Sequence, residues 1–142
     1  MEWRDAFNNI IFSWPAISGP YGNGRLPAGD KDKDWLAEDV SDDKTPEVTN
    51  NMTVAEYCQP DENGKYRSDK CAYCDNAGNC WFLLITPQFA TNRSGIGIHP
   101  DGRNKGTKGC IGIDKKILSS FIRRELDDFI KKFGSLRVEV EE

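Results

Sequence analysis

The sequence has no long apolar run, little histidine and no excess of positive charge. Its 142 residues include 19 Lys and Arg against 23 Asp and Glu, for a formal net charge of −4 at pH 7. Because binding to a phosphate backbone needs a basic face, this balance argues against nucleic acid as a partner. No segment approaches the roughly 20 apolar residues that cross a bilayer. We therefore expect no membrane span.

The amino terminus also lacks the pattern of an export signal. Glu2 and Asp5 stand where a signal peptide is basic, and Asn8, Asn9 and Ser13 interrupt the apolar run that follows. We therefore expect synthesis in the cytoplasm without a signal peptide.

The length of the chain fits one ordinary domain. We expect residues 1–142 to form a single domain with two unusual segments. Residues 30–51 are mostly charged or polar and show no sustained periodicity, which predicts a polar surface insertion. Residues 58–80 form a cysteine-rich segment.

Glycine and proline occur throughout the chain, with 13 and 7 residues respectively, and favour short strands separated by turns. The apolar run at 80–85 predicts a buried strand. Residues 95–99 alternate glycine with isoleucine, which places both isoleucines on one face and His99 on the other, open face. Further strands are expected within 7–17 and, at a sheet edge, over 136–141.

A helical pattern runs from Asp114 to Phe133, where apolar residues recur at spacings of three and four. Asp114 can cap its start and Gly134 its end. An amphipathic helix must bury its apolar face for the domain to be stable, so we expect the whole apolar stripe in the core. The sequence thus predicts a mainly β fold with one amphipathic helix in its C-terminal half.

Five cysteines are many for this length, and four of them lie close together in the chain: Cys58, Cys71, Cys74 and Cys80. In an oxidising compartment these four can form two disulfides, in any of three connectivities. The spacing of Cys71 and Cys74 also suits a zinc knuckle that the other two thiolates complete. We favour disulfides, because a zinc ribbon has two such knuckles and the remaining gaps do not form a second.

The single histidine, His99, and the remaining cysteine, Cys110, lie within one glycine-rich block, residues 95–113. A cysteine attacks as its thiolate, and an imidazole is the side chain best suited to remove its proton near neutral pH. Taken singly, such a histidine is more often structural and such a cysteine more often a small buried hydrophobe. Their combination in this block favours a nucleophile and its base.

Several neighbours have expected supporting roles. The backbone N–H groups of Gly109 and Cys110 would form an oxyanion hole, and Thr107 would stabilise the turn through a hydrogen bond. Asp101 is a candidate for orienting His99, although His-Pro-Asp-Gly is also an ordinary β-turn sequence, which we favour. Glycines opposite the isoleucines, Gly97 among them, leave room for a ligand near the backbone.

The stretch IGIHPDGRNKGTKGCIGI resembles the catalytic motif of the YkuD-type L,D-transpeptidases, in which a histidine-bearing strand is followed by a loop ending in Ser/Thr-His-Gly-Cys. The upstream stretch SWPAISGPYGNGRLPAG is similar to a segment of a compact branch that includes type VI secretion effectors. The matching segments are residues 12–29 and 95–113. The sequence departs from the motif at Lys108, where a second histidine is usual, and at Gly112, where arginine is usual.

The resemblance implies a YkuD-like L,D-transpeptidase catalytic domain that needs no cofactor and no metal. Cys110, deprotonated by His99, would attack the carbonyl at the L-centre of diaminopimelate in a peptidoglycan stem peptide and expel terminal D-alanine. Water would then release the thioester as L,D-carboxypeptidase activity, and an amine would give cross-linking or exchange. Asp101, Lys108 and Gly97 would line the substrate site.

The resemblance also implies an antibacterial toxin, delivered as a monomer to the periplasm of a target bacterium. Its partners would be a secretion-apparatus component and a cognate immunity protein. A phage or prophage cell-wall enzyme fits the same residues less well, since the reaction remodels stem peptides more than it opens glycan strands.

An alternative from a different class is a non-catalytic binding module stabilised by zinc, with Cys110 merely buried. That alternative predicts about one zinc ion per chain and a harmless Cys110→Ala change. The enzyme hypothesis predicts a Cys110 thiol that alkylates rapidly.

Overall fold

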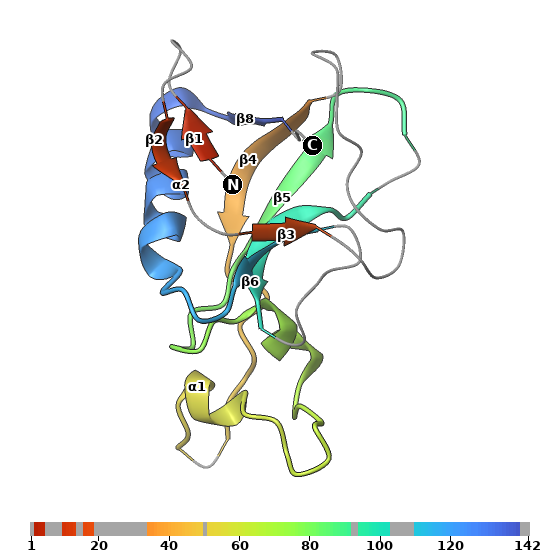
Figure 1. The fold of residues 1–142 in the computed structure, drawn as a ribbon, viewed down its shortest axis with the longest axis vertical. Coiled ribbons are helices and arrows are strands. Elements are labelled where there is room, and N and C mark those ends of the chain that lie inside the picture. The colour runs from red at the N-terminus through yellow and green to blue at the C-terminus, as the bar shows by residue number, and fades with distance from the viewer. Residues whose placement is uncertain are drawn as a thin grey trace.

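The structure is a computed structural model of the chain. It describes residues 34–49, 51–91, 94–102 and 110–139 with their side chains, and the backbone alone of residues 2–4, 10–13 and 16–18. Figure 1 shows a curled sheet with one long helix beside it and a segment of loops and short helices at one end.

The described chain is mainly β, as predicted, with one helix longer than two turns. The strands are β1 (Glu2–Arg4), β2 (Ile10–Ser13), β3 (Ala16–Ser18), β4 (Trp35–Ser41), β5 (Phe82–Pro87), β6 (Gly97–Asp101), β7 (Ile111–Asp114) and β8 (Leu136–Val138). The helices are α1 (Val54–Tyr57), the 3₁₀ helix η1 (Asp69–Tyr73) and α2 (Ser120–Phe133). The predicted strands in 7–17, 80–85, 95–99 and 136–141 are confirmed, with shifted boundaries.

Six of the strands form one sheet in the order β3-β7-β6-β5-β4-β8, while β1 and β2 pair separately. Strands β6 and β7 are parallel, and the other neighbours are antiparallel. β8 lies at the sheet edge, as the alternating sequence predicted. β6 carries the single histidine, and β7 begins immediately after Cys110.

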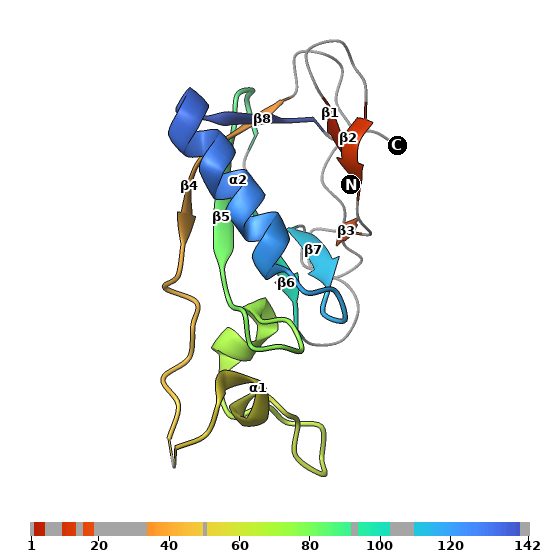
Figure 2. The same ribbon diagram turned by 90° about the vertical axis from the view of Figure 1, so that its left-hand side faces the viewer.

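One face of this sheet packs against α2, which crosses it diagonally in Figure 2. Leu83, Ile85 and Ile98 are fully buried there, in one cluster with Leu126 of α2. Side chains alternate between the faces of a strand. The residues that alternate with them along each strand, His99 among them, therefore belong to the face opposite α2.

The prediction of a surface insertion over residues 30–51 is wrong for residues 35–41, which form β4 inside the sheet. Trp35 and Ala37 are fully buried. The register of β4 with β5 shifts between Ala37 and Val40, and the two acidic residues at the shift are exposed. This bulge interrupts the alternation by which a strand is recognised in a sequence.

The helix also begins later than predicted. Residues 111–114 form β7, and the Asp114 carboxylate accepts a hydrogen bond from the Lys116 backbone N–H, 2.9 Å away, in the turn that follows. Ser119 precedes the first turn of α2. The predicted end is confirmed, because Gly134 has φ 84° and its N–H donates to the Ile130 carbonyl.

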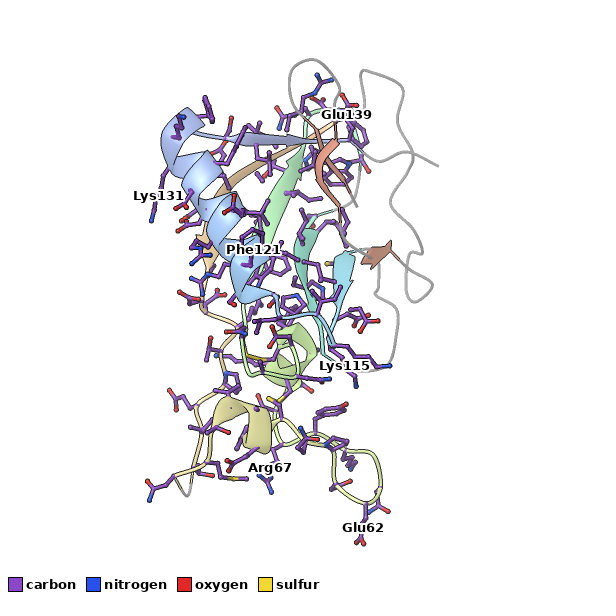
Figure 3. The ribbon with its side chains drawn as sticks, turned by 60° about the vertical axis from the view of Figure 1, so that its left-hand side comes forward. Glu62, Arg67, Lys115, Phe121, Lys131 and Glu139 are labelled. Carbon is purple, nitrogen blue, oxygen red and sulfur yellow. A yellow bond between two sulfur atoms is a disulfide. The ribbon has the colours of Figure 1, made fainter. Side chains whose placement is uncertain are left out.

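Only part of the apolar stripe on α2 lies in the core. Ile122, Leu126 and Ile130 are buried, whereas Phe121 and Phe133 are 41% and 61% exposed. The expectation that the whole stripe is core is therefore wrong. The polar side of the helix faces solvent as predicted, and Lys131 projects from it away from the sheet (Figure 3).

The cysteine-rich segment contains two disulfides, Cys58–Cys71 and Cys74–Cys80, which confirms the disulfide prediction and resolves the connectivity. In this state the four sulfurs that a zinc site would need are bonded in pairs. Cys110 takes part in neither disulfide.

A buried carboxylate joins this segment to the start of α2. Asp75 accepts hydrogen bonds from the backbone N–H and the hydroxyl of Ser119, at 2.8 and 2.6 Å. The indole N–H of Trp81 donates to the same hydroxyl, 3.0 Å away. A buried carboxylate is costly unless such donors surround it. This network therefore fixes the segment against the end of the sheet.

Candidate active site

His99 lies in β6, and Cys110 immediately precedes β7, the strand that runs parallel to β6. Ile98 lies opposite Ile111, and His99 lies opposite Gly112. Continuing this register by one residue sets Cys110 opposite Gly97, two positions before His99 on the neighbouring strand. Residues two apart along a strand share a face. The register therefore brings both candidate residues to the face opposite α2.

The imidazole of His99 is held in one orientation. Its Nδ1 lies 2.6 Å from the Pro100 carbonyl oxygen. A carbonyl can only accept a hydrogen bond, so Nδ1 carries the proton and Nε2 is the basic nitrogen. Burial lowers the pKa of His99 from its ordinary value of 6.5. The ring is therefore neutral near pH 7 and ready to accept a proton at Nε2.

The group that holds Nδ1 is a backbone carbonyl. Of the two expectations for Asp101, the β-turn is wrong, and an orienting role toward His99 stays a prediction from the sequence. His99 to Asp101 lie within β6, so they do not form the β-turn that we favoured. Asp101 is buried, 7% exposed, at the end of that strand. It lies opposite Asp114 of β7.

Two aromatic rings cover His99, which is only 5% exposed rather than open as the sequence suggested. Phe82 of β5 stacks on the imidazole with 5.9 Å between ring centroids and 19° between planes. Tyr73 of η1 meets it edge-on at 4.8 Å. Lys44 lies over both aromatic rings. No pattern in the sequence indicated a role for any of these three residues.

The space beside Gly97 is occupied by protein. A Cβ atom at this position would lie 2.6 Å from the Leu83 carbonyl oxygen and in contact with the Phe82 ring. The glycine therefore admits Phe82 beside His99, and the expected room for a ligand near this backbone is absent. Gly97 supports the histidine's aromatic cover instead of lining a substrate channel.

Gly97→Ala is expected to lower the free energy of unfolding by about 1–3 kcal/mol, because overpacking next to a backbone atom forces side chains and strands apart. Urea unfolding measures this cost. Adding Phe82→Leu should recover part of the loss, since it removes the ring that the new methyl group meets. Equal stability of Gly97→Ala and the wild type would contradict the packing described above.

The thiol of Cys110 is half-buried, and its sulfur lies 4.0 Å from the Gly95 carbonyl oxygen. Burial raises its pKa above the ordinary value of 9.0, although the Gly97 backbone and the charge of Lys44 oppose this effect. Cys110 and His99 therefore rest as a neutral pair near pH 7. A nucleophilic Cys110 would then have to give up its proton as the sulfur attacks, because no thiolate is present beforehand.

Cys110 should consequently react slowly with iodoacetamide at pH 7, and its rate should keep rising as the pH passes 9. This expectation differs from the rapid alkylation that the sequence suggested. The measurement is the rate of Cys110 modification, by intact mass, from pH 6 to pH 10, with Cys110→Ala as the control for other sites. Fast modification that is constant between pH 6 and pH 8 would contradict a neutral resting pair.

The disulfide-bonded segment supports the histidine-bearing strand directly. Gly102, just after β6, donates its N–H to the Ala72 carbonyl oxygen at 3.0 Å. A side chain at Gly102 would collide with the carbonyl oxygens of Cys71 and Cys74. Tyr73 lies between these two cysteines, one from each disulfide. The disulfides therefore hold both the end of β6 and the ring that covers His99.

Three predicted site residues, Thr107, Lys108 and Gly109, lie outside the described residues. The oxyanion hole at Gly109 and the substrate contact of Lys108 remain predictions from the sequence. In the part of the chain that the structure describes, no three His, Cys, Asp or Glu side chains gather as potential metal ligands.

Comparisons of the chain with protein-family models, with curated proteins and with solved structures found no match. Among the described residues, no helix has the length and apolar character to span a membrane. Support for a function therefore comes from the site geometry and from the motif around His99 and Cys110.

Proposed function

We propose that the protein is a cysteine L,D-transpeptidase and L,D-carboxypeptidase that acts on peptidoglycan stem peptides, with a YkuD-like fold. The observation that carries this proposal is the orientation of His99. Its Nδ1 is engaged by the Pro100 carbonyl, which leaves Nε2 as the basic nitrogen. The register of β6 with β7, continued by one residue, sets Cys110 on the same sheet face as His99. The His-to-Cys motif described above supplies the substrate class.

In the proposed reaction, the Cys110 thiol gives its proton to Nε2 of His99 as the sulfur attacks the carbonyl at the L-centre of diaminopimelate. The tetrahedral intermediate collapses when the imidazolium returns that proton to the nitrogen of departing D-alanine. A thioester remains on Cys110. Burial favours the neutral imidazole, and this preference helps the return of the proton.

The thioester then has two fates. His99 removes a proton from water, which attacks the thioester carbonyl and releases a shortened stem and the Cys110 thiol. Alternatively, the amine of another stem or of a D-amino acid attacks, giving cross-linking or exchange. Both fates regenerate the neutral Cys110–His99 pair.

We further propose that the protein is a type VI secretion effector toxin acting in the periplasm of a target bacterium. The two disulfides support this assignment, because disulfides persist in oxidising compartments such as the periplasm. A secretion-apparatus component and a cognate immunity protein would be its partners. The disulfides speak against the zinc-stabilised module, which needs the same four sulfurs as thiolates. A phage or prophage cell-wall enzyme remains the second candidate.

Mass analysis of muropeptides tests the proposal. Purified peptidoglycan fragments are incubated with the wild type and with Cys110→Ala, whose folding is checked by circular dichroism. We expect tetrapeptide stems to become tripeptides, or to exchange their terminal D-alanine, with the wild type alone. Unchanged stems in both reactions would refute the proposed activity on these substrates.

A further inference from the structure

Lys44 is a half-buried cation on the aromatic cover of His99. Its Nζ lies 4.9 Å from the centroid of the Tyr73 ring and 5.7 Å from that of Phe82. Both of these rings pack on the imidazole of His99. The ammonium group is therefore separated from the candidate base by one layer of aromatic side chains.

No carboxylate pairs with Lys44 among the residues that the structure describes. Other basic side chains do form such pairs: Arg123 with Asp42, Lys131 with Asp127 and Arg137 with Asp34. Aromatic faces attract a cation and hold it in place, but they leave its hydrogen-bond donors unsatisfied. An ammonium held in this position gains from an anion that supplies oxygen acceptors.

The charge of Lys44 also reaches the reacting pair. It lowers the pKa of both His99 and Cys110. A cation disfavours an imidazolium and favours a thiolate, so the two directions agree with one positive charge near both groups. An anion bound at Lys44 would therefore lie within electrostatic reach of both groups.

We propose that Lys44 binds the terminal carboxylate of the stem peptide and thereby selects the amide bond next to it for attack by Cys110. This inference rests on the proposed function and adds a substrate-binding residue to it. In a stem that ends in D-alanine, the carboxylate lies three bonds from the scissile carbonyl carbon. A cation on the aromatic cover of the candidate base thus favours release of a C-terminal residue over cleavage within a longer peptide.

A comparison of two substrates tests this assignment. The wild type should release the terminal residue faster from a tetrapeptide stem with a free carboxylate than from the same stem ending in an amide, by about 10- to 100-fold. Lys44→Met should bring this ratio close to one by slowing the acid substrate. Lys44→Arg should retain most of the preference, and Lys65→Met, a change of an exposed lysine in a distant loop, should leave it unchanged.

Alkylation of Cys110 provides a test that needs no peptidase activity. Iodoacetate carries a carboxylate and iodoacetamide does not, while both react with the same thiolate. Any effect of Lys44 on the thiol pKa therefore cancels in the ratio of their rates. Lys44→Met should lower the iodoacetate-to-iodoacetamide ratio by about 3- to 10-fold at low salt, with a smaller difference at high salt.

The outcomes separate the inference from the proposed function. If the wild type processes stem peptides but treats acid and amide alike, the role of Lys44 is overturned and the enzyme assignment stands. If no stem is processed while the alkylation ratio still falls in Lys44→Met, an anion site beside Cys110 is supported and the stem-peptide assignment fails. An unchanged alkylation ratio in Lys44→Met overturns the anion site itself.

Discussion

Replacing His99 with asparagine should slow D-alanine release from tetrapeptide stems by about 100- to 10,000-fold, the range that a general base contributes. The asparagine amide can donate to the Pro100 carbonyl in place of Nδ1–H, but it offers no basic nitrogen in place of Nε2. The variant should therefore keep its fold and lose its base. Steady-state release of D-alanine, alongside urea unfolding, measures both properties.

The pH dependence separates this role from a structural one. Because burial lowers the pKa of His99 below 6.5, the imidazole stays neutral to a lower pH than an exposed histidine does. The acid limb of kcat/KM in the wild type should accordingly have its midpoint below pH 6.5, and His99→Asn should lose that limb. A midpoint above 6.5, or the same acid limb in the variant, would assign it to another group.

Reduction of the two disulfides is the other change for which we expect a large effect. The bonds close loops with sequence separations of 6 and 13 residues. Loop-closure entropy then gives about 2 and about 3 kcal/mol of stabilisation. Their sum is comparable to the total stability of a marginal domain. We expect the reduced protein to lose most of its stability.

Activity should fall together with stability. The disulfide-bonded segment contains Tyr73, whose ring packs on His99, and its Ala72 carbonyl accepts a hydrogen bond from Gly102 at the end of β6. D-alanine release in the presence of dithiothreitol should drop at least tenfold and return after reoxidation. This reductant leaves Cys110 as a thiol, so the nucleophile itself is unaffected.

Double serine variants assign the loss to each disulfide. Serine at Cys74 and Cys80 should lower the free energy of unfolding by about 2 kcal/mol, and serine at Cys58 and Cys71 by about 3 kcal/mol. Cys110→Ala, whose disulfides are intact, serves as the matched control and should lose stability on reduction as the wild type does. Equal stability and activity of the oxidised and reduced proteins would show that the segment does not support the site.

The sequence was most informative where a pattern is local. The Gly-Ile alternation before His99 placed Ile96 and Ile98 on one face, and the structure buries both. The apolar run at 80–85 predicted a strand, although Leu84 is 48% exposed because only one face of β5 packs against the core. Clustered cysteines correctly indicated disulfides, while their connectivity needed the structure.

The environment of His99 could not be predicted in this way, because it depends on pairings between distant segments. Phe82 reaches the histidine through the antiparallel register of β5 with β6, and Tyr73 through the position of η1. Lys44 lies in a polar stretch whose charges gave no sign of a site. The bulge in β4 concealed the strand that leads to it. The contacts of Phe82, Tyr73 and Lys44 around His99 depend on how distant segments pack together, which no short motif encodes.

The most direct test of the central claim is detection of the acyl group on Cys110. The protein is mixed with a tetrapeptide stem, quenched in acid within seconds, and its mass is measured before and after proteolysis. We predict an increase equal to the stem minus D-alanine, located on the peptide that contains Cys110 and absent from Cys110→Ala. Turnover of the stem without such an adduct, or an adduct on any other residue, would contradict a thioester mechanism at Cys110.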